Sequence, residues 1–256
     1  MSALWSAPPL DEPWAERSRV SLLRVDPALR AAVAPEDVAP AEQALMAPCL
    51  RLPRGRWAPE MLAAAGKHPF AALLLDGVVT YEITLAGRRS AQLLGPGDLL
   101  RPWASIEASL RYSSSWSAAG DAAIAVLDDH FLVAARRWPR LATVVYDRLA
   151  DQMEVGAVRA AIVALPRVEQ RVLALFWQLA DRWGVVRPEG VVVRLALTHE
   201  VIGRLVGAQR PTISLALHTL AEQDLLCRDD AGAWTLARDS LATLAGDGRI
   251  AGGPPG

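Results

Sequence analysis

The stretch LTHEVIGRLVGAQRPTISLALHTLAEQDLL, residues 197–226, predicts two short helices joined by a tight turn. The first helix begins after Thr198, whose hydroxyl can accept a backbone N–H that the first turn leaves unpaired. Its apolar residues have the spacing of one buried helical face: Val201, Ile202, Leu205 and Val206. Gly207 marks its end, because helices commonly end in a left-handed residue.

The second helix begins near Gln209, and Pro211 sits in its first turn, where a proline loses no hydrogen bond. Its apolar face consists of Ile213, Ala216, Leu217 and Leu220. The residues left mostly outward are Arg210, Thr212, Ser214, Leu215 and His218. This pattern is typical of a helix-turn-helix, whose second helix enters the DNA major groove. An αα-hairpin in an ordinary helical core gives the same pattern, so the helix pair alone does not decide the function.

A further element follows the helix pair in residues 227–236, CRDDAGAWTL. The polar turn residues Asp229, Asp230 and Gly232 stand between two short apolar ends, which predicts a β-hairpin. A hairpin in this place is the wing of a winged helix and favours the DNA-binding interpretation.

Residues 197–236 resemble the DNA-binding domain of the Crp/Fnr family of bacterial transcription regulators. The residues that carry the resemblance are Thr198, the Val206–Gly207 turn, Arg210, Thr212 and a leucine-rich exit. Upstream, PRVEQRVLALFWQLADRWG, residues 166–184, resembles the long helix that opens this domain in the family. The resemblance implies a regulator with a recognition helix at 209–223. Its candidate partners are double-stranded DNA, a second copy of the chain, RNA polymerase and a small-molecule effector.

The recognition helix differs from that of the cyclic-AMP regulator. By position, the family's base-contacting Arg-Glu pair falls on Arg210 and Pro211, and a second family arginine falls on Leu215. Arg210 can donate two hydrogen bonds to guanine, whereas Leu215 can touch only a thymine methyl. The resemblance therefore implies a different target sequence. The candidate DNA-binding residues are Thr198, His199, Gln209, Arg210, Pro211, Thr212, Ser214, Leu215 and His218, with Thr198 as a phosphate anchor at a helix N-terminus.

Residues 70–127 have the pattern of a β domain. FAALLLDGVVTYEITL gives two β-rich runs broken by Asp76–Gly77, and SAQLLGPGDLL gives a strand closed by the turn at 95–98. Short strands at this spacing predict a small antiparallel barrel or jelly roll. Gly77, Gly87 and the GPGD turn resemble glycine landmarks of the family's cyclic-nucleotide-binding-like barrel. The predicted fold class is α+β: an N-terminal antiparallel β-barrel, a long connecting helix and a C-terminal winged helix-turn-helix.

The interval after this turn, residues 99–121, departs from the family pattern. Members that bind cyclic AMP carry a Gly-Glu pair and then an arginine before a small hydroxyl residue, because a buried phosphate needs a bidentate partner. Here no Gly-Glu pair is present, Arg101 precedes a proline and Arg111 precedes a tyrosine. We therefore do not expect cyclic AMP to bind in the usual way. Candidates for a different effector pocket are Arg101, Trp103, Arg111 and Tyr112. The alternative is that Trp103 and Trp116 are core residues of the barrel.

Residues 129–165 predict a long helical stretch whose main helix begins near Pro139. Its apolar residues recur at spacings near three and four: Leu132, Val133, Leu141, Val144, Val145, Leu149 and Met153. In the family that the chain resembles, this helix is the dimer seam. A two-fold dimer places two recognition helices about 34 Å apart. The alternative is that the stripe packs only on its own barrel.

Composition limits the other functions. The 256 residues carry a net charge of −1, and residues 166–245 contain nine Arg against nine Asp plus Glu. This balance is an objection to a nucleic-acid role, because DNA-binding domains usually carry basic excess. Cys49 and Cys227 are too few for an iron–sulfur cluster, and the four histidines show no ligand spacing, so we expect neither metal nor cofactor. No nucleophile–base pair, metal motif or phosphate loop indicates an enzyme.

The expected organisation has five parts: a flexible arm at 1–20, a sensory β-barrel domain at 21–128, a connecting and dimerisation helix at 129–165, a winged helix at 166–245 and a disordered tail at 246–256. The arm, with Trp5 and Trp14, is either a frayed terminus or a segment that docks on its own domain or a partner. No long uncharged apolar run and no signal peptide are evident, so we expect a cytoplasmic protein.

Overall fold

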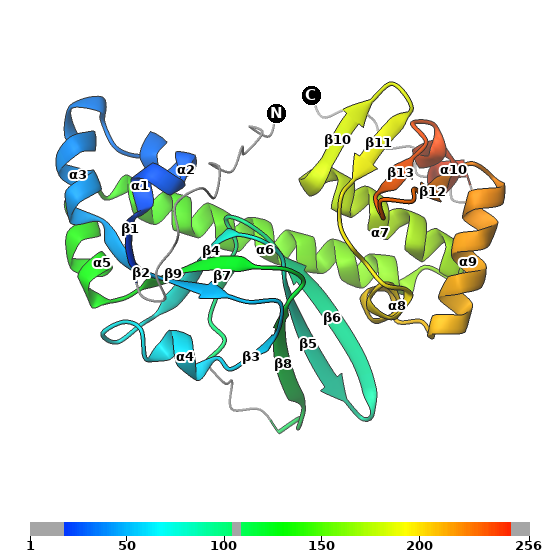
Figure 1. Cartoon of the computed structure of the whole chain (residues 1–256), viewed down its shortest axis with the longest axis horizontal. Coiled ribbons are helices and arrows are strands. Elements are labelled where there is room, and N and C mark those ends of the chain that lie inside the picture. The colour runs from blue at the N-terminus through cyan, green and yellow to red at the C-terminus, as the bar shows by residue number, and fades with distance from the viewer. Residues whose placement is uncertain (1–17, 104–108, 247–256) are drawn as a thin grey trace. The chain divides into compact units, whose positions relative to one another are not determined.

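The computed structural model describes residues 18–103 and 109–246, which belong to two compact units (Figure 1). The first unit comprises residues up to 88 together with 92–154, and the second comprises 89–91 together with the chain from 155 onward.

Two antiparallel sheets form the first unit. The first sheet has the order β1 (Ser18–Ser21), β2 (Met46–Leu52), β9 (Ala122–Leu127), β4 (Ala71–Asp76) and β7 (Leu99–Leu100). The second has the order β3 (Gly55–Trp57), β8 (Ser113–Ala118), β5 (Val79–Leu85) and β6 (Arg88–Leu94). The predicted jelly-roll-like fold is confirmed. The barrel is not closed, because the described strands form two separate sheets.

The first sheet is buried on both faces because successive strand residues point to opposite sides. On β4, Ala72 and Leu74 belong to an apolar cluster shared with the second sheet, whereas Leu73 and Leu75 belong to a cluster shared with helices. β9 is buried at every position. The burial of β9 explains why its sequence, AAIAVL, is continuously apolar rather than alternating.

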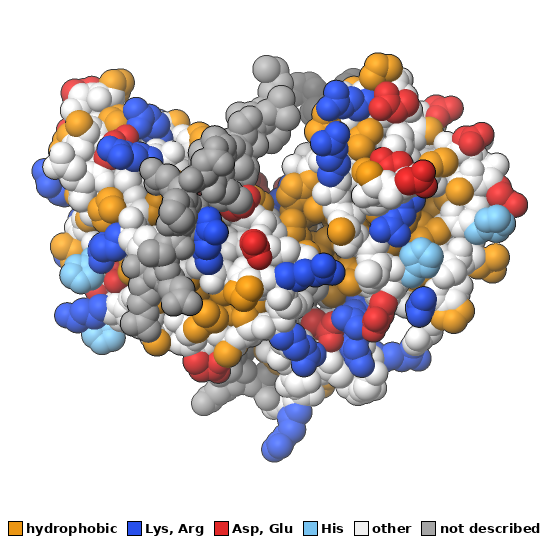
Figure 2. All heavy atoms as spheres, in the orientation of Figure 1, with side chains coloured by type: hydrophobic (Ala, Val, Ile, Leu, Met, Phe, Trp, Pro, Cys, Tyr) orange, Lys and Arg blue, Asp and Glu red, His pale blue; other side chains and the backbone are white. Residues whose placement is uncertain are grey.

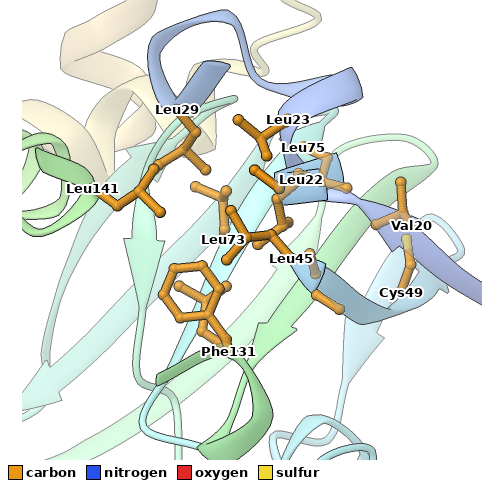
Figure 3. Packing of buried hydrophobic residues seen from close by; sticks show 14 of the residues in the cluster. Val20, Leu22, Leu23, Leu29, Leu45, Cys49, Leu73, Leu75, Phe131 and Leu141 are labelled. Atoms are coloured by element: carbon orange, nitrogen blue, oxygen red, sulfur yellow. The ribbon is translucent and has the colours of Figure 1, made fainter. Parts of the chain in front are cut away.

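Short helices cover the outer face of the first sheet. They are α1 (Leu22–Val25), α2 (Pro27–Ala31), the 3-10 helix η1 (Pro35–Asp37), α3 (Val38–Ala44) and α5 (Asp129–Ala135), while α4 (Glu60–Ala63) contributes Leu62 to the inter-sheet cluster. Figure 3 shows Leu29, Leu73 and Phe131 meeting in the helical cluster. Asp26 caps α2 by accepting the N–H groups of Ala28 and Leu29 at 3.1 and 3.0 Å.

Strand β1 includes residues 18–20, which were predicted to belong to the flexible arm at 1–20. These residues pair with β2, and Val20 is buried in the helical cluster. Burial of Val20 therefore holds this segment on the sheet, although its sequence has no clear periodicity. The remainder of the predicted arm, residues 1–17, and the tail from 247 lie outside the described residues.

The connecting helix α6 (Arg140–Ala164) is continuous over 25 residues. At its start Leu141 is buried in the helical cluster. Further on, the Gln152 amide accepts the Leu99 N–H and donates to the Leu99 carbonyl, both at 3.1 Å. Leu149 and Met153 remain exposed. The predicted apolar stripe therefore divides into residues that pack on the first unit and residues that face outward.

The second unit combines helices with a four-stranded sheet in the order β10 (Gly184–Arg187), β11 (Gly190–Val193), β13 (Trp234–Leu236) and β12 (Leu226–Arg228). Its helices are α7 (Val168–Trp183), α8 (His199–Val206), α9 (Arg210–Glu222) and α10 (Ser240–Gly246). The hairpin predicted at 227–236 is confirmed as β12 and β13. The hairpin of β10 and β11 was not predicted, and it extends the wing into a sheet.

Candidate nucleic-acid interface

The platform of the interface is α7, which presents one strongly apolar face. Its buried residues are Val172, Leu173, Leu175, Phe176, Leu179 and Ala180. Phe176 contacts Trp234 of the wing with ring centroids 4.7 Å apart. The Trp177 indole N–H donates to Ser240 Oγ of α10 at 3.1 Å. These contacts fix the wing and α10 against the same helix that supports α8 and α9.

Local sequence signals set the bounds of α8. Thr198 is its N-cap, and its Oγ1 accepts the Val201 N–H at 3.2 Å. Gly207 ends it in the left-handed region, at a φ of 70°. A close contact that the sequence did not predict lies at Gly203, where an added Cβ would stand 2.6 Å from the Ala208 carbonyl oxygen. Only glycine at position 203 lets the turn fold back this tightly on the helix.

The recognition helix α9 begins at Arg210 with Gln209 as its N-cap, and Pro211 lies in its first turn. Its buried residues are the four that the sequence predicted: Ile213, Ala216, Leu217 and Leu220. Its exposed residues include Arg210, Pro211, Thr212, Ser214, Leu215 and His218. Within the described residues, the Arg210 guanidinium makes no hydrogen bond or ion pair and is available to a ligand.

A side-chain hydrogen bond joins the two helices of the motif. His199 Nδ1 lies 2.9 Å from Ser214 Oγ, and the Ser214 hydroxyl donates to the Arg210 carbonyl at 3.2 Å. Because that hydroxyl has a single proton, His199 Nδ1–H is the donor to Ser214. This contact holds the start of α8 against the first turn of α9, and spacing alone could not have revealed it.

His218 lies farther along the exposed face of α9. Its Nε2 is 3.3 Å from a carboxylate oxygen of Glu222, one helical turn on, and both side chains are mostly exposed. The Glu222 carboxylate offsets the charge of a protonated His218. His218 thus has a carboxylate partner, whereas Arg210 has none within the described residues.

The tip of the wing is acidic. Asp229 Oδ1 accepts the Ala233 N–H at 2.8 Å, which stabilises the turn of the hairpin. Arg228, just before it, places its guanidinium 5.1 Å from the ring centroid of Trp234. Basic and acidic side chains are interspersed on the face of this unit shown in Figure 2. On this face (Figure 2) the basic side chains are separated by acidic and apolar ones rather than gathered in one broad patch.

The residues proposed for an effector pocket lie near the inter-sheet cluster. Trp103 is half-buried against that cluster, whereas Arg101, Arg111 and Tyr112 are exposed. Trp116 is buried and stacks on Tyr81, with centroids 4.3 Å apart. The barrel-core alternative is correct for Trp116. Segment 104–108, between the predicted pocket residues, lies outside the described residues.

A hollow of about 750 Å³ lies elsewhere on the first unit, at α2, η1 and α3. Val33 and Val38 contribute to its apolar lining, and Arg30 and Glu42 add charged groups. Glu42 binds both Arg24 and Arg30, at 2.9 and 2.5 Å, and these two hydrogen bonds lower the pKa of its carboxyl. The predicted pocket residues do not line this hollow.

The described part of the chain contains no group of three or more His, Cys, Asp and Glu side chains placed to hold a metal ion. No helix in it is long and apolar enough to cross a bilayer.

Comparison with known proteins agrees with this geometry. The Crp-like helix-turn-helix domain model matches residues 170–244. A cyclic nucleotide-binding domain containing protein from Listeria monocytogenes is similar in fold, with a TM-score of 0.63 and 14% identity over 85% of this chain and 99% of that one. FixK2 from Bradyrhizobium japonicum has a TM-score of 0.58 and 18% identity, covering 77% of this chain and 96% of its own. A CooA mutant from Carboxydothermus hydrogenoformans has a TM-score of 0.58 and 17% identity, covering 78% and 86%. No curated protein sequence matches.

The described chain combines a jelly-roll-like unit, a long connecting helix and a winged helix-turn-helix, the architecture typical of a DNA-binding regulator. The match over residues 170–244 identifies this part of the chain as a Crp-like helix-turn-helix domain, and the chain as a whole shares the fold of those structures.

Proposed function

We propose that the chain acts as a homodimer in the bacterial cytoplasm and binds a palindromic DNA operator with α9 in the major groove. The observation that carries the proposal is the α8–α9 pair. Its first helix is capped, its turn is fixed by Gly207, and its second helix presents Arg210 without a partner in the described chain. A helix-turn-helix presents the N-terminal residues of its second helix to the base edges.

Arg210 is the proposed base-reading residue. A guanidinium donates two parallel hydrogen bonds to guanine O6 and N7, and the Arg210→Ala variant should cost about 1–3 kcal/mol at one base position. Thr198 and His199, at the N-terminus of α8, are the proposed phosphate contacts because backbone N–H groups there favour an anion. Gln209 and Thr212 are further candidate contacts.

The proposed dimer forms through the exposed side of α6. Its apolar and small residues are spaced alternately by four and three, and we call them the α6 seam: Ala142, Tyr146, Leu149, Met153, Gly156, Ala160 and Val163. This is the spacing of the a and d positions of a coiled coil. Met153 is 77% exposed and Tyr146 is 71% exposed, so a partner helix would remove considerable apolar surface from water. The seam supports a two-fold dimer more strongly than packing on the chain's own sheets.

The proposed sensory role does not use cyclic AMP in the usual way. A buried phosphate requires a buried bidentate arginine, and both Arg101 and Arg111 are exposed. We propose a small-molecule effector of another class, with Trp103 and Tyr112 among the candidate contacts. RNA polymerase is the proposed protein partner at the promoter. A thermal-shift measurement with cyclic AMP should show no stabilisation, whereas a bound ligand raises the unfolding temperature by mass action.

The experiment that tests the function is selection of bound duplexes from a randomised DNA pool by the purified protein. Enrichment of an inverted repeat with half-sites one or more helical turns apart is expected. Absence of any enriched sequence, with the protein folded and an effector screen negative, would contradict sequence-specific binding.

A second candidate function is protein–protein interaction through the winged helix. The neutral charge of residues 166–245 and the exposed Leu215 favour it. Salt dependence separates the two functions, because each neutralised phosphate releases counterions and DNA affinity falls steeply with salt. Binding of duplex DNA that does not change with salt would favour the second candidate.

A further inference from the structure

The recognition helix carries an apolar side chain, Leu215, on its solvent-exposed face, where it is not stabilised by burial. Leu215 is 63% exposed, although the other leucines of α9, Leu217 and Leu220, are buried. Pro211 is also exposed and lies four residues earlier, so the two side chains share one face of the helix. We call this pair the Pro211–Leu215 ridge. It contributes little to the core of the second unit, so the fold does not account for it.

Two of the polar side chains beside the ridge, Ser214 and His218, are engaged within the domain. Ser214 Oγ accepts from His199 and donates to the Arg210 carbonyl. His218 pairs with Glu222 at the other end. Only the guanidinium of Arg210 remains as an unpaired charged group next to the ridge within the described residues. A surface that combines one fork of N–H donors with an apolar ridge is suited to a ligand that offers acceptors and methyl groups side by side.

We infer that the Pro211–Leu215 ridge reads thymine methyl groups in the major groove, next to the base that Arg210 contacts. This inference rests on the proposed DNA-binding function and deepens it. The thymine C5-methyl is the apolar group that the major groove of unmodified DNA offers, and it distinguishes thymine from the other bases. Each half-site of the operator therefore contains a guanine with at least one thymine within two or three base pairs of it.

The test removes the methyl group without changing any hydrogen bond. Once an operator has been selected, each thymine of one half-site is replaced in turn by deoxyuridine, and the dissociation constants are measured. At one or two positions the affinity should fall about fourfold, the loss expected for one methyl group no longer buried. In the Leu215→Ala variant the thymine and deoxyuridine duplexes should bind equally well, because the partner of the methyl is gone.

A matched control comes from the same unit. Leu241 of α10 is also exposed, at 51%, and the Leu241→Ala variant should keep the full difference between thymine and deoxyuridine. Leu215 and Leu241 lie outside the core, so both variants are expected to fold, which circular dichroism and unfolding temperature check.

The possible results separate the inference from the function on which it rests. If the operator binds tightly and no deoxyuridine substitution weakens it, the ridge does not read methyl groups, while DNA binding stands. If the deoxyuridine effect persists in Leu215→Ala, another residue reads the methyl and the assignment is wrong. If no duplex is bound under any condition, the proposed function fails and the inference falls with it.

Discussion

At the scale of single residues, the tightness of the α8–α9 turn depends on the missing side chain of Gly203. An added methyl group would meet the Ala208 carbonyl oxygen at 2.6 Å, and a backbone atom cannot move aside as a flexible side chain can. Gly203→Ala should lower the free energy of unfolding by about 1–3 kcal/mol. It should also weaken DNA binding, because α9 is displaced from α8. Urea unfolding followed by circular dichroism measures the first effect.

Gly120 provides the control for this substitution. A Cβ there meets no atom within 4 Å, and its φ is not in the left-handed region. Gly120→Ala should leave the unfolding transition nearly unchanged. Equal destabilisation by the two substitutions would mean that the close contact at Gly203 is not the cause.

The two cysteines should differ strongly in reactivity. Burial raises the pKa of the Cys49 thiol to about 11, whereas Cys227 is exposed on the edge strand β12. The thiolate is the reactive form, and a raised pKa leaves almost none of it near pH 8. Iodoacetamide should therefore modify Cys227 in the native protein and Cys49 only after denaturation, as mass spectrometry can follow. The Cys227→Ser variant should take up no label until it unfolds; rapid labelling of this variant in its native state would contradict the burial of Cys49.

At the scale of elements, a largely buried ion pair ties α6 to the short helices of the first unit. Arg148 lies 2.7 Å from Asp26, and their side chains are only 16% and 6% exposed. Asp26 also caps α2, so loss of Arg148 leaves a buried carboxylate with backbone partners alone. Arg148→Ala should destabilise the protein by about 3 kcal/mol. The free energy of unfolding from urea titration checks this value.

An exposed pair in the same layer is the natural comparison. Arg24, with its side chain 72% exposed, binds Glu42 at 2.9 Å. Exposed ion pairs contribute little because water and salt screen them. Arg24→Ala should barely change the unfolding curve. If it proved as damaging as Arg148→Ala, burial would not be what separates the two pairs.

Elements with local signals were predictable from the sequence, and those fixed by distant contacts were not. The caps Thr198 and Gly207 bound α8 because capping acts within one turn of the chain. The strands β10 and β11 were missed because runs of valine such as GVVR and GVVV carry no alternation, and because β11 pairs with β13, which lies far along the chain. The candidate effector-pocket residues were the least predictable, because Arg101 follows β7 and Arg111 precedes β8, strands of different sheets that no local sequence signal relates.

At the scale of the whole molecule, the proposed binding to a palindrome depends on the proposed dimer. Two half-sites bound by linked reading domains gain affinity because the second contact is intramolecular. A charge at the centre of the α6 seam should break that linkage. In the Met153→Glu variant two carboxylates would face each other across the two-fold axis in an apolar seam, and desolvation and repulsion both oppose association. We expect a monomer in analytical ultracentrifugation and a loss of palindrome affinity of at least about tenfold.

Val158 supplies the control that assigns this effect to one face of α6. It is 45% exposed, and the heptad places it opposite the seam, five residues after Met153. Val158→Glu adds the same charge to the same helix and should remain a dimer.

A duplex with a single half-site should bind Met153→Glu as well as it binds the unaltered protein, because Arg210 and the Thr198 cap are untouched. If Val158→Glu dissociates while Met153→Glu stays dimeric, the partner helix packs on the other face of α6. If neither substitution changes the mass, the protein does not dimerise through α6, and the spacing of its half-sites must have another origin.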